Sequence, residues 1–473
     1  MEEKKTKVEP YTNVRYEQDC IGIKRIPIDA YYGMQTARAA ENFTITGHPM
    51  HPEFIVAMAE VKKAAAITNA EVGALDKERA DAIIKACDEI IEGKLHEQFI
   101  TDQLQGGAGT SFNMNANEVI ANRAIELMGG EIGDYTIVHP NDHVNCGQST
   151  NDVFPSCGRI TFLRMLDAAN AELERLHHAL NAKADEFDHI IKMGRTQLQD
   201  AVPIRLGQSF RAYATAISRD ISRFARTKSE LRELNLGGTA IGTGLNANPE
   251  YIRNVVGNLA KVTGIDYLAQ ASDLIDATQN TDGFVSVSGV VKSCVMTLSK
   301  ISNDLRLMSS GPQAGFSEIN LPPRQCGSSI MPGKVNPVIP EVVNQVSFNI
   351  IGNDLTITMA AEAGQLELNA FEPIIFYKLY QSLDTLKNAI RTLVDNCVVD
   401  ITANEEYCRN KVESSVGIIT AVNPYIGYSK ASDIATEAIV TRTSVKEIIL
   451  REKLLSEEEL EKILDPHAMT EWE

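Results

Sequence analysis

The chain of 473 residues carries a formal net charge of -18 at pH 7 and is 44% hydrophobic, so it can bury a large core in two or three domains. The acidic balance argues against nucleic acid and anionic membranes as partners. No apolar segment approaches a membrane span, no signal peptide is evident, and eight cysteines without CxxC spacing predict neither disulfides nor a zinc site, so we expect a cytoplasmic protein.

Residues 1–150 are predicted to form a mostly helical N-terminal domain. Helices are expected near residues 32–42, over 51–72 and over 77–92, with glycines at the ends of the last two. Asn115 and Glu118 have the spacing of an N-cap and its acidic partner, which predicts a further helix that ends at Gly129.

The central region, residues 151–403, shows long helical patterns. From Pro155 to Ile191 apolar residues recur on one stripe over about eight turns, and similar stripes run over 287–308 and 376–397. Helices are also expected over 208–234 and 337–351. Such lengths exceed the usual roughly 11 to 12 residues and indicate a helical bundle, whose remaining apolar surface partner subunits would cover.

Residues 404–473 are predicted to form a small C-terminal helical domain. The pattern changes there to short helices, and Ser444 with Glu447 and Ser456 with Glu459 read as capping boxes. The predicted fold is therefore mainly α, with a long central helical bundle flanked by N-terminal and small C-terminal helical domains.

The segment GSSIMPGKVNP, residues 327–337, has the composition of a mobile loop. It presents the hydroxyls of Ser328 and Ser329 together with the amine of Lys334. Asn336 is a good N-cap residue and Pro337 suits the first position of the helix that follows. Hydroxyls, a cation and free N–H groups at a helix start favour the binding of a small anion.

Three other loops are equally rich in hydroxyl and amide side chains: GGAGTS (106–111), GQSTND (147–152) and GRTQLQD (194–200). Taken singly, each is best explained as a capping segment before a helix. Taken together, converging helix N-termini would hold a small dicarboxylate. The glycine-rich GGTAIGTG (237–244) lacks a preceding strand and the P-loop lysine, and is interpreted as a turn.

The chemistry of these loops favours proton abstraction next to a carboxylate. No metal-ligand cluster or cofactor motif accompanies them, and acyl transfer would need a base beside the serine. Proton abstraction requires donors for the charge that builds on an enediolate, and hydroxyls and backbone N–H groups supply them. A serine would serve as the base if N–H groups and the lysine held its alkoxide.

The loop GSSIMPGKVNP resembles the signature of the fumarase and aspartase superfamily, and the similarity covers nearly the whole chain. Members have a long central helical bundle and form homotetramers whose active sites combine segments of three subunits. They release ammonia, water or an amine to give fumarate. QSTND and EAGQLELNAFEP (362–373) are more similar to aspartases than to class II fumarases, which usually carry QSSND.

The resemblance implies reversible deamination of L-aspartate to fumarate and ammonia. It implies no organic cofactor; some aspartases respond to divalent metal, but the sequence shows no cluster of ligands for one. The alternatives are a class II fumarase acting on malate and a non-catalytic structural member, such as the lens crystallins drawn from this superfamily.

The resemblance also assigns roles to residues. Ser328 would take the proton from C3, and Lys334 and Asn336 would bind the α-carboxylate. Two further sets are implied: for the β-carboxylate and its enediolate, Thr110, Ser149, Thr150 and Ser329; near the leaving amino group, Asn151, Thr196 and Gln197. Position 197 is histidine in many relatives, and glutamine cannot take up a proton at neutral pH.

Overall fold

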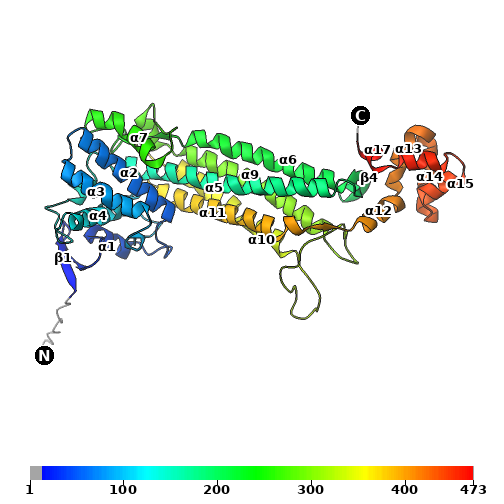
Figure 1. Cartoon of the computed structure of the whole chain (residues 1–473), viewed down its shortest axis with the longest axis horizontal. Helices are drawn as coiled ribbons and strands as arrows, with labels where there is room; N and C mark the ends of the chain where they lie inside the picture. Colours follow the sequence, from blue (N-terminus) through cyan, green and yellow to red (C-terminus); the bar gives the residue numbers. More distant parts are fainter. Residues whose placement is uncertain (1–12, 472–473) are drawn as a thin grey trace. The chain divides into compact units, whose positions relative to one another are not determined.

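The computed structural model describes residues 13–471, and its contacts divide the chain into two compact units. The first comprises Met1–Asp167, Arg226–Val290 and Ile351–Leu383; the second comprises Ala168–Ala225, Val291–Ile350 and Asp384–Glu473. Helices dominate both units, which confirms the mainly α fold (Figure 1). The domain boundaries at residues 150 and 403 stay a prediction.

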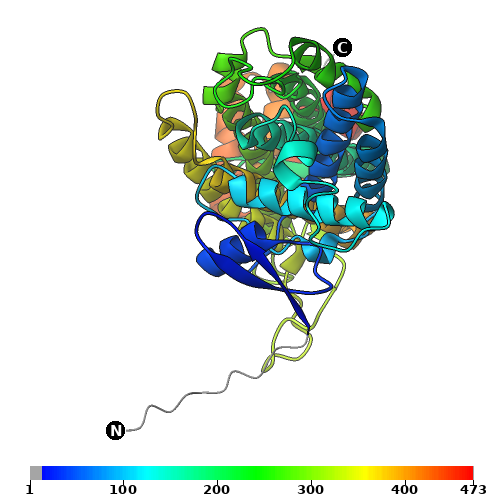
Figure 2. The same cartoon turned by 90° about the vertical axis from the view of Figure 1, so that its left-hand side faces the viewer.

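The N-terminal part of the first unit contains the helices that the sequence predicts. They are α1 (Met34–Asn42), α2 (Pro52–Glu71), α3 (Lys77–Ile91) and α4 (Thr110–Leu127). The predicted cap at Asn115 is wrong, because Asn115 and Glu118 lie inside α4, which has Gly109 at its N-cap. An antiparallel hairpin of β1 (Val14–Gln18) and β2 (Ile23–Pro27), drawn in blue in Figure 2, was not predicted.

Glu118 serves the N-terminus of α1 instead of that of α4. Its carboxylate accepts hydrogen bonds from the backbone N–H groups of Gly33 (2.8 Å), Gln35 (2.8 Å) and Thr36 (3.1 Å), and from the Thr36 hydroxyl (2.6 Å). A Cβ at position 33 would lie 2.8 Å from the Glu118 carboxyl carbon, so the approach requires glycine. Burial raises the pKa of Glu118, and the donors of α1 oppose that rise.

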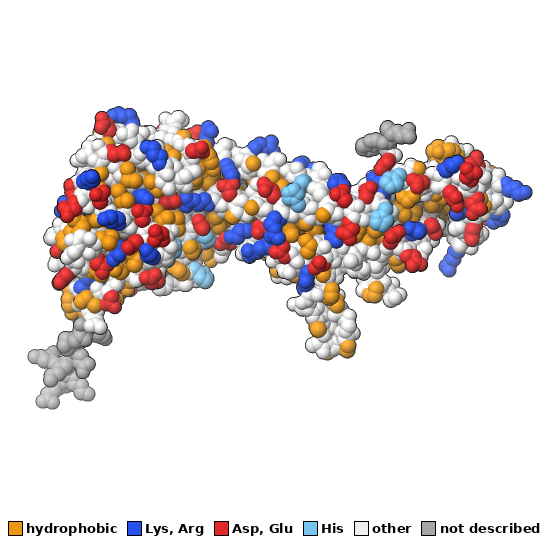
Figure 3. Space-filling model, viewed as in Figure 1, with side chains coloured by type: hydrophobic (Ala, Val, Ile, Leu, Met, Phe, Trp, Pro, Cys, Tyr) orange, Lys and Arg blue, Asp and Glu red, His pale blue; other side chains and the backbone are white. Residues whose placement is uncertain are grey.

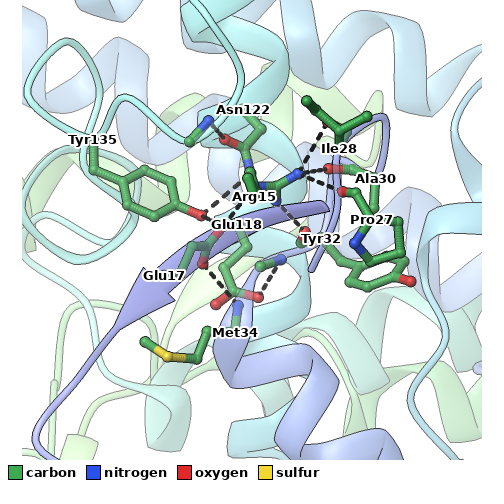
Figure 4. A network of polar contacts seen from close by, with 12 residues as sticks. Arg15, Glu17, Pro27, Ile28, Ala30, Tyr32, Met34, Glu118, Asn122 and Tyr135 are labelled. Carbon is green, nitrogen blue, oxygen red and sulfur yellow. Dashed lines mark hydrogen bonds and ion pairs between the residues drawn. The ribbon is translucent and has the colours of Figure 1, made fainter. Parts of the chain in front are cut away.

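Arg15 joins the hairpin to the same region (Figure 4). Its guanidinium donates to the carbonyl oxygens of Pro27 (2.9 Å), Ala30 (2.7 Å) and Tyr32 (2.7 Å), and pairs with Glu17 at 2.8 Å. The guanidinium therefore fixes the chain between β2 and α1 by supplying a charged donor to several of its carbonyl groups.

An aromatic cluster forms the centre of the first unit. It lies among α2, α4 and the parts of α5 (Thr150–Glu186), α9 (Asp282–Met308) and α11 (Glu372–Asn396) that belong to this unit. Its fully buried rings are Phe54, Phe112, Phe154, Phe162, Phe284 and Phe376. The rings of Phe154 and Phe376 stack at 5.2 Å, and edge-to-face contacts join most of the others.

Long helices also pack against one another in the second unit, which includes parts of α5, α9, α11, α6 (Leu206–Thr227) and α10 (Val338–Glu362). The Tyr213 hydroxyl on α6 donates to Asp304 on α9 at 2.8 Å, and the Asn344 amide on α10 donates to the Ser299 hydroxyl at 2.9 Å. The predicted helical bundle is therefore confirmed. Helix α6 ends seven residues earlier than predicted, because a short strand and turn follow.

Helix α9 corrects the expectation that no segment approaches a membrane span. It has 27 residues, and an 18-residue stretch of it has a mean hydropathy of 1.4, which is in the range of a membrane-crossing helix. Its apolar stripe is buried inside the protein at Phe284, Val287, Cys294, Leu298 and Leu305. Buried core helices meet the same length and hydropathy criterion, so one such helix is weak evidence for a membrane span.

The sequence predicts that the GRTQLQD segment (194–200) directly precedes a helix. In the structure it forms the turn and flanking strands of a hairpin instead. Strands β3 (Ile191–Thr196) and β4 (Gln199–Arg205) pair antiparallel. The first unit also contains α7 (Pro249–Thr263), α8 (Leu274–Gln279), and the parallel pair β5 (Glu233–Leu234) and β6 (Ala269–Gln270). In the second unit β7 (Ile319–Asn320) pairs antiparallel with β8 (Thr402–Ala403).

The C-terminal residues form short helices, as predicted: α12 (Glu405–Ser414), α13 (Ile419–Ile426), α14 (Tyr428–Thr441), α15 (Val445–Arg451), α16 (Glu457–Ile463) and α17 (Pro466–Thr470). Both capping boxes, at Ser444 and Ser456, are confirmed. Met193 of β3 joins the core of these helices, so the hairpin base is continuous with their packing.

Candidate active site

The start of α4 lies against the start of α5. Gly109, the N-cap of α4, has φ +92°, and a Cβ there would lie 2.4 Å from the ring of Phe154 in α5. Only glycine fits this approach. Thr110 is therefore held near the first turns of α5, and its hydroxyl donates to the Gly107 carbonyl at 2.8 Å. Two of the four predicted loops are thus brought together within the first unit.

Helix α5 begins with a reciprocal cap. The Ser149 hydroxyl accepts from the Asn151 N–H at 3.2 Å, and the Asp152 carboxylate accepts from the Ser149 N–H at 2.9 Å. Asp152 is fully buried and also accepts from the N–H groups of Gly237 and Thr239, both at 3.0 Å. Burial raises the pKa of Asp152 to about 6, and these backbone donors limit the rise.

The glycine-rich segment 237–244 is a turn, as predicted, but it also fixes the start of α5. Besides the two bonds to Asp152, the carbonyl oxygen of Ala240 accepts from the Asn151 amide at 2.7 Å. Asn235, just before the turn, donates to the Asn151 carbonyl at 3.0 Å. The sequence contains no local signal for this contact, since the partners are more than 80 residues apart.

A buried polar chain lies beneath Thr150. The Asn113 amide donates to the Thr150 hydroxyl oxygen at 3.0 Å and to Asn145 Oδ1 at 3.3 Å. Lys62 Nζ donates to Asn145 Oδ1 at 2.8 Å and to Gln148 Oε1 at 2.9 Å. Sequence reasoning did not identify these supporting residues, because Lys62 looks like a helix surface lysine and Asn113 like part of a capping segment.

Thr196 and Gln197 lie at the exposed tip of the β3–β4 hairpin. Gln197 and Leu198 both have positive φ, at +54° and +63°. This is the pattern of a type I′ turn, which usually uses asparagine and glycine. Side chains larger than glycine are strained in this region, and such strain is typical of functional sites.

A buried ion cluster anchors this hairpin to the segment that precedes the loop of residues 327–337. The Glu318 carboxylate, 2% exposed, accepts from Arg195 at 2.7 Å and pairs with Lys192 at 3.1 Å. The Arg195 guanidinium also lies 4.2 Å from the centre of the Phe316 ring. Arg195 is adjacent to Thr196, so these contacts determine where the hairpin tip begins.

The loop of residues 327–337 is closed at its base by two hydrogen bonds of Gly327. Its N–H donates to the Lys334 carbonyl, and its carbonyl accepts from the Asn336 amide, both at 2.8 Å. A Cβ at position 327 would lie 2.6 Å from the Lys334 oxygen, so glycine is required. The predicted cap by Asn336 is wrong, because this side chain closes the loop and α10 begins one residue later than expected, at Val338.

Ser328 lies in a small nest of backbone donors. Its Oγ accepts from the N–H groups of Ile330 (3.2 Å) and Met331 (3.0 Å). Hydrogen bonds to an alkoxide oxygen favour the charged form. Ser329 and Lys334 are exposed, and so are the apolar side chains of Ile330 and Met331. Figure 3 shows this segment projecting from the surface with hydrophobic side chains at its tip.

The predicted site residues form two sets, one in each unit. Thr110, Ser149, Thr150 and Asn151 are joined by α4 and α5 within the first unit. In the second unit, no hydrogen bond between described residues joins the hairpin tip to the loop of residues 327–337. Within residues 13–471 no group of three or more His, Cys, Asp or Glu side chains is arranged to hold a metal ion.

Comparison with known proteins gives consistent matches over nearly the full length. The family model described as "Lyase" matches residues 22–352, and "Fumarase C C-terminus" matches residues 418–471. An aspartate ammonia-lyase of a Bacillus species is 56% identical over 459 residues, covering 97% of this chain and 98% of the relative. An aspartate ammonia-lyase of Helicobacter pylori is 53% identical over 458 residues, covering 96% and 98%.

Two solved structures are similar as well. A cobalt-bound fumarate lyase:delta crystallin of Brucella melitensis has a TM-score of 0.95 at 49% identity, covering 97% of this chain and 100% of that one. A recombinant class II fumarase of Schistosoma mansoni has a TM-score of 0.90 at 35% identity, covering 96% and 99%.

Proposed function

The chain belongs to the lyase family of enzymes, and from this premise we propose that it catalyses the reversible deamination of L-aspartate to fumarate and ammonia. Relatives named aspartate ammonia-lyase, 52–56% identical over 96–97% of the chain, support this substrate. The structural observation that carries the proposal is the environment of Ser328, whose oxygen receives two backbone N–H groups in a loop that also bears Lys334.

In the proposed mechanism, the Ser328 alkoxide removes the C3 proton of L-aspartate. The electron pair of the broken C–H bond moves into the β-carboxylate, which becomes an enediolate with an additional negative charge. Thr110, Ser149, Thr150 and Ser329 are proposed to donate hydrogen bonds to it. Each such donor is worth about 3 to 4 kcal/mol where water is excluded.

In the second step the enediolate collapses, C2 and C3 become doubly bonded, and the C2–N bond breaks. The substrate amine is an ammonium, so it leaves as neutral ammonia with the electron pair of that bond. No acid is then needed at the leaving group. Gln197 fits this step although it cannot transfer a proton, because its amide oxygen can accept a hydrogen bond from the ammonium.

The loop of residues 327–337 is proposed to act as a lid. Its exposed Ile330 and Met331 would be covered on closure, which excludes water from the charge on the enediolate. Lys334 is proposed to bind the α-carboxylate as a point charge, together with Asn336. In the structure the Asn336 amide donates a hydrogen bond to the Gly327 carbonyl. Closure of the loop on a substrate would replace this carbonyl by the α-carboxylate as the acceptor.

A direct assay should separate this function from that of a class II fumarase, the function of one structural relative. We expect fumarate, followed by its ultraviolet absorbance, to appear from L-aspartate with release of one ammonia per fumarate. Turnover of L-malate should be at least about 10³-fold slower, because hydroxide is a much poorer leaving group than ammonia and Asn151, Thr196 and Gln197, the residues proposed near the leaving group, cannot protonate it at neutral pH. Fumarate from malate and none from aspartate would overturn the proposal.

We also propose that the enzyme is a homotetramer with shared active sites. Helix α10 leaves a stripe of large apolar residues exposed, with Leu355 at 62% and Met359 at 64%. Ile351, one turn earlier on the same helix, is 41% exposed. A contiguous apolar stripe of this kind marks a protein interface, and a second copy of the bundle is the natural partner.

Charges on this stripe should dissociate the assembly. We expect the double substitution Leu355→Glu and Met359→Glu to lower the mass measured by sedimentation equilibrium to that of a monomer or dimer and to remove most activity. Val440→Glu, on a 76% exposed apolar residue of α14, is the matched control and should leave the mass unchanged. A wild-type chain that sediments as an active monomer would contradict the proposal.

A further inference from the structure

Lys62 is a fully buried lysine in α2 whose partners are neutral amides. Its amine donates to Asn145 Oδ1 at 2.8 Å and Gln148 Oε1 at 2.9 Å. Among the residues that the structure describes, no carboxylate lies within ion-pair distance of it. A buried amine without an ionic partner costs free energy, and an apolar side chain of similar length would fill the same space without that cost.

The hydrogen bonds of Lys62 do not depend on its charge. Burial lowers its pKa to about 7, and the nearby Cys157 and Asp152 on α5 and Cys87 on α3 act in the opposite direction. An ammonium offers three N–H groups and a neutral amine offers two, which is the number of amide oxygens that it contacts. The neutral amine therefore still has enough N–H groups to donate to both oxygens.

As an ammonium, Lys62 can only donate, so it holds the amide oxygens of Asn145 and Gln148 toward itself. The Gln148 carbonyl supports this orientation, because it accepts from the Asn145 amide nitrogen at 3.2 Å. Asn145 must turn its oxygen toward Lys62, and that oxygen also accepts from the Asn113 amide nitrogen at 3.3 Å. Asn113 must therefore present its nitrogen on this side, and the same nitrogen donates to the Thr150 hydroxyl at 3.0 Å. The Asn113 oxygen, in contrast, is buried with no donor among the described residues. Its own surroundings thus do not select this orientation.

The orientation of Asn113 decides what the Thr150 hydroxyl can do. A hydroxyl has one hydrogen to donate, and Thr150 receives a hydrogen bond from Asn113 and so keeps its own hydrogen for another acceptor. If Asn113 were reversed, Thr150 would donate to the Asn113 oxygen and would present only lone pairs to an anion. Lone pairs facing a carboxylate repel it.

We propose that Lys62 is a positioning residue that, through Asn145 and Asn113, directs the Thr150 hydroxyl as a hydrogen-bond donor toward the substrate carboxylate that becomes the enediolate. This inference rests on the proposed function, in which Thr150 contacts that carboxylate. Lys62 itself is separated from the substrate by Asn145, Asn113 and Thr150, and is not proposed to touch it.

A double-mutant cycle between Lys62→Met and Thr150→Val tests the inference, with the full-length enzyme and whichever of aspartate or malate it turns over. Thr150→Val should lower kcat about 10²-fold by removing one donor to the enediolate. Lys62→Met should lower kcat about 10- to 100-fold and change KM less than about threefold, because the donor matters most when the charge has developed. In the Thr150→Val background, Lys62→Met should cost less than about threefold, since its target is gone.

Lys63→Met is the matched control. Lys63 is the next residue of α2, is partly exposed and pairs with Asp88, so the same substitution there should leave kcat unchanged. If Lys62→Met does not fold, Asn145→Leu removes the next member of the chain and enters the same cycle. The inference is overturned if Lys62→Met, or Asn145→Leu in its place, lowers kcat by the same factor in the wild-type and in the Thr150→Val backgrounds. Lys62 would then have only a structural role. Failure of the proposed function would appear separately, as a wild-type enzyme that releases no ammonia.

Discussion

Replacing Ser328 by alanine should lower kcat by about 10³-fold or more while the oligomer stays folded. The expected loss follows from the role of the hydroxyl as the base, since removing a general base costs 10²- to 10⁴-fold. Among the described residues, the hydrogen bonds of Ser328 Oγ stay within the loop, where it accepts from the N–H groups of Ile330 and Met331. Steady-state fumarate formation measures the effect, and circular dichroism and sedimentation check the fold.

Ser329→Ala provides the comparison within the same loop. Ser329 is proposed to donate to the enediolate and not to take a proton, so its loss should cost less than that of Ser328. A deuterium label at C3 of aspartate sharpens the test, because exchange of that deuterium with water should disappear in Ser328→Ala and persist in Ser329→Ala. Substantial exchange in Ser328→Ala would show that another group removes the proton.

The long helices were predictable because their cores repeat an apolar residue every three or four positions. Helices α2, α3 and α11 have nearly the bounds expected from the sequence, and the capping boxes at Ser444 and Ser456 are in place. Such signals are local, so neighbouring residues suffice to read them. The β3–β4 hairpin was missed because its turn uses glutamine and leucine where a hairpin signal normally has asparagine and glycine.

The loops of the candidate site were predictable from the sequence. The buried residues that hold those loops in place were not. Hydroxyl and amide residues before helices identified the segments with Thr110, Ser149 and Ser328. Lys62 could not be recognised, because a lysine in a helix is usually solvated and its burial depends on residues more than 80 positions away. Assembly of the two sets of residues into one site also remains a proposal, which the homotetramer would satisfy.

Glu118 also shows that a local sequence signal does not identify partners that are distant in the chain. The sequence predicts it as a capping partner in its own helix. The residue does cap a helix, but that helix is α1, 82 to 85 residues earlier in the chain. The spacing from Asn115 to Glu118 occurs by chance inside α4, where both side chains are buried. A capping signal in the sequence therefore identifies a suitable side chain and does not identify the N-terminus that it serves.

Replacing Glu118 by alanine should strongly destabilise the N-terminal region. It would leave three backbone N–H groups and the Thr36 hydroxyl without their acceptor. Each unsatisfied buried group costs about 1 to 3 kcal/mol, and partial hydration should leave a net loss of about 3 to 5 kcal/mol. Glu118→Gln keeps one acceptor oxygen and should lose roughly half as much.

Urea unfolding gives the size of the effect, and hydrogen exchange gives its location. Exchange should accelerate first at the amides of Gln35 and Thr36, because α1 loses its N-terminal acceptor before the rest of the unit opens. Glu126→Ala is the matched control on α4: its partly exposed carboxylate pairs with Arg123, so its removal should cost less than about 1 kcal/mol. If Glu118→Ala were no more destabilising than Glu126→Ala, water would have to satisfy the start of α1, and the buried carboxylate would not be what holds it in place.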